Sequence, residues 1–254
     1  MVVKQMTSNR EKVVGIIAAT ICDAKLGASQ IMKKGFKAIP FYISPSPNQQ
    51  TALQNNKNLL TKKVILAIEF LINEGASFIV IYCYSMSLSI DMNSILNKFQ
   101  VKIISPLEIV KDLKFSSTYV GLMCANNIAL SNSEKIFSRL HPKIKLIGVG
   151  AISIVESIEK SIEPNLLIKK HGIIKIFEFF KLNNCHDLIL GCTHFEYFYQ
   201  ELLYKLNRTN NQLNCVPIFD LLLKKLIEIV NETNPSIAPT QPSENEAYFQ
   251  QHHT

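Results

Sequence analysis

Four segments of the first half of the chain recur in the second half in the same order. The matched pairs are KVVGIIAAT (12–20) with TYVGLMCAN (118–126), FKAIPFYIS (36–44) with IKLIGVGAI (144–152), SFIVIYC (77–83) with HDLILGC (186–192), and VKIISPLEIV (101–110) with NCVPIFDLLL (214–223). The spacing is nearly constant, so that Gly15 aligns with Gly121 and Cys83 with Cys192. A repeat of this kind predicts two related structural units that face each other.

The matched segments are apolar almost throughout, and helical patterns separate them. Residues 23–35 and 55–75 have the pattern of helices, and the second ends at Gly75, a typical helix stop. Apolar strands that alternate with helices are typical of parallel sheets covered on both faces. We therefore expect an α/β fold of two similar domains, a pseudo-symmetric repeat. Each domain has a central parallel sheet flanked by helices, and the active site lies in the cleft between them.

The repeat also gives the expected boundaries. The first α/β half spans residues 12–112, carries Cys83 and can be completed by the C-terminal helix. The second half spans residues 113–231 and carries Cys192. Residues 232–254 are rich in Pro, Ser, Asn and Gln and have no strand or helix period, so we expect a disordered tail or a remnant of an expression tag.

The composition narrows the class of protein. No apolar run reaches the ~18 residues of a membrane span, and the start MVVKQMTSNREKVV lacks the apolar core of a signal peptide. We expect a cytoplasmic protein with no membrane partner. Six cysteines without a CxxC pair do not indicate a disulfide framework. The net charge of +7 is spread along the chain, which predicts no nucleic-acid partner and suits a small anionic substrate.

In each half the third strand ends at a cysteine, and a hydroxyl residue follows: YCYS (82–85) and GCTH (191–194). Ligands of parallel sheets bind beyond the carboxyl ends of strands, so Cys83 and Cys192 should lie on opposite walls of one cleft. A thiolate on one wall can remove the α-proton of an amino acid, and a thiol on the other can return a proton to the opposite face. Donors at the substrate carboxylate would stabilise the carbanion-like transition state, and Ser85 and Thr193 are suitable.

These residues resemble a known family. LILGCTHF (188–195) is very similar to the second-half signature of glutamate racemases, and FIVIYCYSMS (78–87) resembles the first-half signature of the aspartate/glutamate racemase superfamily. The resemblance covers about residues 12–231. It implies a racemase, an isomerase of D- and L-amino acids, that needs no cofactor, acts on glutamate or aspartate and forms a homodimer.

The resemblance also assigns roles. It makes Cys83 and Cys192 the two acid/base residues and Ser85 and Thr193 carboxylate-binding hydroxyls, whereas His194 contacts the substrate or relays a proton. The first loop, AATICDAKLG (18–27), should line the site. From this loop we select Thr20 and Asp23 as substrate-binding candidates.

The sequence departs from the family pattern at several positions. Tyr84 stands where the family often has a substrate-contacting Asn, so we include Tyr84 among the substrate-binding candidates. Asn127 and Ile128 stand where the family often has a Gly-Thr pair that binds substrate. Asn126 is a candidate replacement for that pair. Ser44, in the turn-rich loop SPSPNQQ (44–50) at the expected rim of the cleft, is a further candidate. The departures leave the substrate open between glutamate, aspartate and another carbon acid.

Two alternatives remain at this stage. The first is a catalytically weak family member that binds an acidic ligand or a protein partner, which the altered Tyr84 position motivates. The second is a zinc site, for which Cys185, His186, Cys192 and His194 offer suitable ligands. Residues 187–191 are predicted as a strand, at roughly 3.3 Å per residue, which would separate the two pairs of ligands. We therefore predict no metal.

Overall fold

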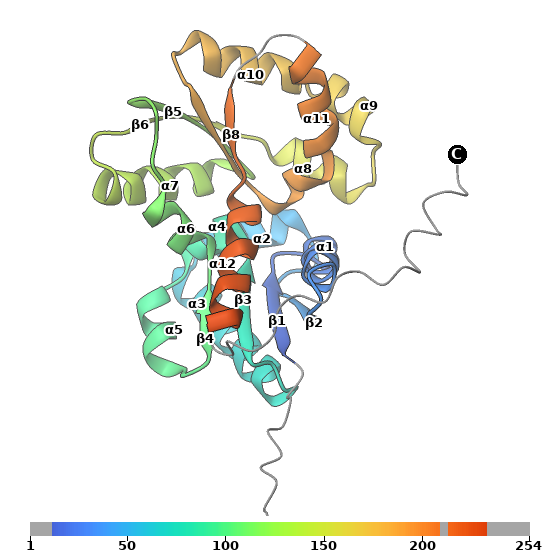
Figure 1. Cartoon of the computed structure of the whole chain (residues 1–254), viewed down its shortest axis with the longest axis vertical. Helices are drawn as coiled ribbons and strands as arrows, with labels where there is room; N and C mark the ends of the chain where they lie inside the picture. The colour runs from blue at the N-terminus through green and yellow to red at the C-terminus, as the bar shows by residue number, and fades with distance from the viewer. Residues whose placement is uncertain (1–11, 209–212, 233–254) are drawn as a thin grey trace, which may run out of the picture.

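Two parallel sheets with the same strand order organise the chain. The computed structural model describes residues 12–208 and 213–232, and the predicted tail beyond Glu232 lies outside this part (Figure 1). The first sheet has the order β2-β1-β3-β4 and the second the order β6-β5-β7-β8. The strands are β1 (Val13–Ala18), β2 (Lys37–Tyr42), β3 (Phe78–Tyr82), β4 (Lys102–Ile104), β5 (Tyr119–Cys124), β6 (Lys145–Gly150), β7 (Asp187–Gly191) and β8 (Asn214–Val216). The shared order confirms the predicted pair of similar α/β units.

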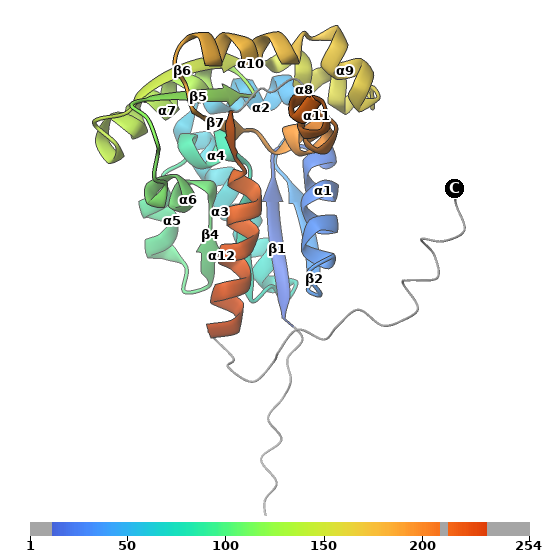
Figure 2. The ribbon, with the colours of Figure 1, turned by 45° about the horizontal axis from the view of Figure 1, so that its top comes forward.

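Helices connect the strands and cover both sheets (Figures 1 and 2). In the first half they are α1 (Ile21–Met32), α2 (Pro47–Gln54), α3 (Lys57–Asn73), α4 (Tyr84–Ser89), α5 (Met92–Lys98) and α6 (Pro106–Asp112). They continue with α7 (Asn127–Leu140), α8 (Ile152–Glu159), α9 (Pro164–Lys170), α10 (Ile173–Leu182), the short 3-10 helix η1 (Thr193–Phe195), α11 (Glu196–Arg208) and α12 (Ile218–Glu232). No helix within the described ranges has the length and apolar character to cross a membrane.

One segment differs from its prediction. Residues 44–50 were expected as a loop, but helix α2 begins at Pro47 within them. Ser46 is its N-cap, and the Ser46 hydroxyl accepts a hydrogen bond from the Gln49 backbone N–H at 3.4 Å. Proline at the first helical position after a serine cap favours a helix start, because its missing N–H would have no partner there. The turn residues of this segment therefore start a helix.

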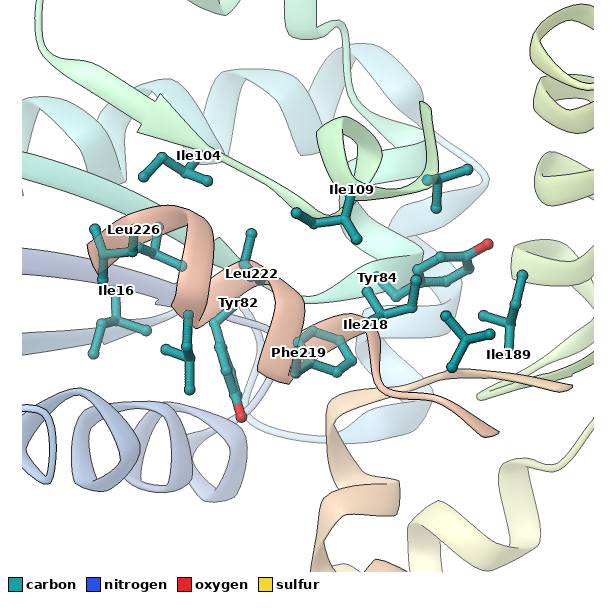
Figure 3. Packing of buried hydrophobic residues seen from close by; sticks show 14 of the residues in the cluster. Ile16, Tyr82, Tyr84, Ile104, Ile109, Ile189, Ile218, Phe219, Leu222 and Leu226 are labelled. Carbon is teal, nitrogen blue, oxygen red and sulfur yellow. The ribbon is translucent and has the colours of Figure 1, made fainter. Parts of the chain in front are cut away.

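The last helix returns to the first sheet. Phe219 of α12 packs against Tyr82 of β3, with ring centroids 5.1 Å apart. Leu222 and Leu226 belong to the same buried cluster as Ile16 of β1 (Figure 3). This cluster also contains residues of the second sheet, among them Leu122 and Ile189, whereas two further clusters fill the individual halves. A shared apolar core therefore joins the two halves, and each fully buried side chain of this size contributes roughly 1.5–3 kcal/mol.

Candidate active site

The two cysteines occupy equivalent positions. Cys83 follows β3 directly and Cys192 follows β7 directly. Each is the N-cap of the next helical turn with an extended backbone, at φ −162° for Cys83 and −154° for Cys192. Both side chains are buried and line one cavity between the halves. Because the two sheets direct the carboxyl ends of their strands toward the same cavity, a thiol stands on each wall.

The predicted site residues gather around this cavity, which encloses about 350 Å³ of empty space including the part open to solvent. The predicted residues that line it are Thr20, Asp23, Cys83, Tyr84, Ser85, Asn126, Cys192, Thr193 and His194. Ser44 is buried behind this layer. Its hydroxyl donates a hydrogen bond of 2.8 Å to Oε1 of Gln50, which lines the cavity. Ser44 therefore does not line the cavity itself, but it holds the side chain of Gln50, which does.

His194 is the centre of a charged network. Its Nε2 lies 2.7 Å from Oε1 of Glu159, and its Nδ1 lies 3.8 Å from Sγ of Cys192 and 3.0 Å from Oδ1 of Asp23. Burial disfavours the charged imidazole, but Asp23, Cys192 and Glu159 together raise the pKa of His194 well above its ordinary value. The imidazolium can donate from Nε2 to the carboxylate and from Nδ1 to the thiol. A positive charge thus stands 3.8 Å from the Cys192 sulfur.

Glu159 connects this network to the first half. The Thr20 hydroxyl donates a hydrogen bond of 2.6 Å to the same Oε1 atom that contacts His194. Burial opposes ionisation of Glu159, but the hydrogen bonds from His194 and Thr20 hold its pKa below the ordinary value. Glu159 is therefore ionised at neutral pH, and it joins α8 of the second half to the loop before α1.

Asp23 presents a buried carboxylate to the cavity. Its side chain is 1% exposed, and burial raises its pKa to about 6, although His194 and Thr193 oppose this shift. Among the described residues, neither Asp23 carboxylate oxygen has a well-aligned hydrogen bond, so the 3.0 Å approach to His194 is a contact between charges. Buried acceptors normally find a donor. Two acceptor atoms at a cavity wall suit a cationic group such as the ammonium of an amino acid.

The second thiol has a different environment. Burial raises the pKa of Cys83 to about 12, and the charge of Asp23 adds to the effect, whereas Ser85 and the Met86 backbone N–H oppose it. The Ser85 hydroxyl lies 3.5 Å from the Cys83 sulfur. Cys83 is therefore protonated at rest. One wall carries a thiol and the other a sulfur beside an imidazolium, as proton transfer between two bases requires.

Two predicted substrate contacts already have protein partners. The Tyr84 hydroxyl lies 3.1 Å from the hydroxyl of Ser133 in α7, and the Tyr84 ring is packed so closely that a Cβ on Gly191 would lie 3.0 Å from it. The Asn126 amide donates to the Thr51 hydroxyl at 3.0 Å, and its oxygen accepts from a backbone N–H of α7 at 2.8 Å. Both residues therefore join the two halves in addition to lining the cavity.

Sequence reasoning missed three polar residues of the site. Glu159, the last residue of α8, belongs to the His194 network, and Gln50 and Gln54 of α2 line the cavity. The repeat contained a usable signal. Helix α2 follows the second strand of the first half as α8 follows the second strand of the second half, and both helices line the same cavity.

One cluster has the donors for a metal. The ligand atoms of Cys22, Glu159 and His194 all lie within 4.8 Å of one another, and these atom types suit zinc. The hydrogen bond between Glu159 and His194 already explains the approach of two of them. The four ligands weighed from the sequence have β7 between their two pairs, and Cys185 packs in the core of the second half.

The fold and the paired thiols define a two-domain α/β protein with a cysteine on each wall of its cavity, and comparisons with known proteins agree with this fold. No protein-family model matches the chain. It is 29% identical over 196 residues to a glutamate racemase of Campylobacter curvus, covering 72% of each chain. Among solved structures, glutamate racemase from Francisella tularensis in complex with D-glutamate superposes with a TM-score of 0.62 at 16% identity, covering 92% of this chain and 85% of that one. An aspartate racemase homologue from Pyrococcus horikoshii gives a TM-score of 0.56 at 17% identity, covering 86% and 98%.

The sequence relatives are glutamate racemases, and the fold is shared with glutamate and aspartate racemases, so the comparisons support the aspartate/glutamate racemase superfamily, an amino-acid racemase family. The sequence-based recognition of the family is confirmed.

Proposed function

We propose that the protein is a cofactor-independent racemase of an acidic amino acid, glutamate or aspartate, and that Cys83 and Cys192 transfer the proton. One observation carries the proposal: two buried thiols from opposite halves line a single cavity, and only Cys192 has the His194 imidazole within 3.8 Å. The names of the relatives support the same reaction class.

The reaction follows from these two environments. The Cys192 thiolate removes the α-proton, and the electron pair of the C–H bond is delocalised into the α-carboxylate of the substrate. The Cys83 thiol then donates its proton to the opposite face of the α-carbon. The product has inverted configuration, Cys192 is left as the thiol and Cys83 as the thiolate. The reverse reaction uses the same groups with their roles exchanged.

The neighbouring side chains stabilise the charges of this reaction. The hydroxyls of Ser85 and Thr193, two and one residues after the cysteines, are placed to donate to the α-carboxylate, where charge develops. The Asp23 carboxylate is placed to accept from the substrate ammonium. The His194 imidazolium, held by Glu159, stabilises the thiolate of Cys192 and loses this role once that sulfur carries the proton.

Two further properties belong to the proposal. The mechanism needs free thiols, so a reducing compartment such as the cytoplasm suits it, and the six cysteines are all unpaired. A homodimer is the assembly that the family resemblance implies, and size-exclusion chromatography with light scattering tests it.

The proposed activity is tested by offering L-glutamate, D-glutamate, L-aspartate and D-aspartate separately to the purified protein. Chiral chromatography should show that at least one pair of enantiomers converts to a racemic mixture. The Cys192→Ala variant should show no conversion. Absence of conversion of all four amino acids by the unmodified protein would contradict the proposal.

A further inference from the structure

Helix α2 presents one face to the active-site cavity. Pro47, Gln50, Thr51 and Gln54 all line it, and this spacing of three and four residues places them on one side of the helix. Gln49, on another side, is exposed. Thr51 already accepts a hydrogen bond from the Asn126 amide, whereas the two glutamines are the buried polar side chains of this face with an unpaired atom among the described residues.

Both glutamines are buried, and only one end of each side-chain amide has a hydrogen-bond partner among the described residues. Gln50 is 3% exposed and Gln54 is 6% exposed. Gln50 accepts a hydrogen bond through Oε1 from Ser44 at 2.8 Å, and Gln54 donates through Nε2 to Ser85 at 3.0 Å. The other end of each amide, Nε2 of Gln50 and Oε1 of Gln54, has no hydrogen-bond partner within the described part of the chain. Buried amide groups are normally paired, so two unpaired ends at one cavity point to a ligand.

Each amide can offer its NH₂ group to that ligand. The partners Ser44 and Ser85 are hydroxyls, which donate and accept equally well. Gln54 uses one N–H of its Nε2 on the Ser85 hydroxyl, and the second N–H of the same group remains for a ligand. Gln50 already has its Nε2 free. The face can therefore provide two neutral donors.

Charge decides which part of an acidic amino acid lies there. No Lys or Arg is among the described residues that line the cavity. Asp23 and Glu159 make the wall around His194 rich in carboxylates. A side-chain carboxylate is repelled from that wall, while the cysteines and the hydroxyls beside them take the α-carbon and the α-carboxylate. Helix α2 is the neutral wall that carries free donors.

We propose that Gln50 and Gln54 form the subsite for the side-chain carboxylate of the substrate, an inference that rests on the proposed function. They act as specificity-determining residues and take no part in proton transfer. The same subsite serves both enantiomers. Inversion changes which thiol faces the α-hydrogen, but the carboxylate at the end of the side chain can stay in the same place.

The test uses the full chain with the variants Gln50→Leu, Gln50→Glu and Gln54→Leu and the matched control Gln49→Leu. Gln50→Glu is nearly isosteric. It keeps an oxygen for the Ser44 hydroxyl and replaces the free donor of Gln50 by an acceptor. Steady-state kinetics with the acidic amino acid that the protein turns over gives KM and kcat in both directions. Calorimetry with its D enantiomer gives Kd and stays informative without turnover.

We expect KM and Kd to rise about 10- to 100-fold in Gln50→Leu and Gln54→Leu, the effect of one lost hydrogen bond to a charged group. The rise should be larger in Gln50→Glu, kcat should change little, and Gln49→Leu should match the wild type.

Unchanged KM and Kd in the Gln50 variants of an active protein would overturn the subsite and leave the racemase function intact. A wild type that binds but does not turn over, with Kd raised in Gln50→Glu, would support the subsite and overturn the function. A wild type that neither binds nor converts either acid would overturn both.

Discussion

The carboxylate of Glu159 lies 2.7 Å from Nε2 of His194, and the opposite nitrogen of the same ring lies 3.8 Å from the Cys192 sulfur. This arrangement links an ionised acid to a thiol through a charged imidazole. In residues 12–208 and 213–232, Cys83 has no imidazole neighbour of this kind, and burial raises its pKa to about 12. The two cysteines of the repeat therefore have different electrostatic surroundings, although their backbone positions are equivalent.

Glu159→Gln tests this link. Removing the carboxylate should lower the pKa of His194, so the imidazolium is lost at a lower pH and the alkaline limb of the kcat/KM profile moves down in pH. Turnover at pH 8 should fall by about 100-fold, the usual contribution of a positioned acid or base. NMR titration of the His194 ring nitrogens measures the pKa directly. Glu178→Gln, which removes an exposed ion-pair partner of Lys175, is the control. An unchanged His194 titration would exclude Glu159 from the network.

Much of the fold could be predicted from the sequence, because the repeat and the apolar strands are strong patterns. The segments matched around Gly15 and Gly121 are β1 and β5, and the cysteines stand at the ends of β3 and β7. Helix α2 could not be predicted, because Ser46 and Pro47 are as typical of a turn as of a helix start. The place of Glu159 in the site could not be predicted either, since an acidic residue at the end of an amphipathic helix is usually exposed to solvent. Only the three-dimensional fold brings it to His194.

Asp23→Asn should trade activity for stability. Burial raises the pKa of Asp23 from 3.8 to about 6, so the folded protein holds this proton more tightly than the unfolded chain does. The wild type therefore loses stability as the pH rises from 4 through 6. The Asn variant avoids that loss and should gain about 1–3 kcal/mol at pH 8 and almost nothing at pH 4. Urea unfolding at both pH values measures the difference, and racemisation by the variant should be strongly reduced. A variant less stable than the wild type at pH 8 would contradict this account of Asp23.

Tyr84→Phe separates packing from substrate contact. The Tyr84 hydroxyl bonds Ser133, whose own hydroxyl also donates to a backbone carbonyl at 2.8 Å. Losing the tyrosine hydroxyl should lower the free energy of unfolding by about 1 kcal/mol. KM should stay within about twofold of the wild type, less than the loss of one hydrogen bond. Tyr42→Phe, on an exposed ring, should change neither quantity. A large rise in KM for Tyr84→Phe would show that its hydroxyl binds substrate.

Alkylation should distinguish the two thiols. The imidazolium beside Cys192 favours its thiolate, and the thiolate is the form that iodoacetamide attacks. Peptide mass spectrometry at pH 7 should find Cys192 labelled before Cys83, and saturating substrate should protect both. Faster labelling of Cys83 would reverse the assignment of base and acid given above.

The central claim, that each thiol serves one face of the α-carbon, is tested most directly by α-proton exchange in heavy water. NMR would follow the L and D enantiomers of glutamate and aspartate with the wild type, Cys83→Ala and Cys192→Ala. In the wild type, the inverted product should carry deuterium at the α-carbon. Cys83→Ala should exchange the α-proton of one enantiomer without inversion. Cys192→Ala should exchange that of the opposite enantiomer, more slowly because Cys83 must first ionise. Inversion by either variant, or exchange of both enantiomers by one of them, would contradict the two-thiol mechanism.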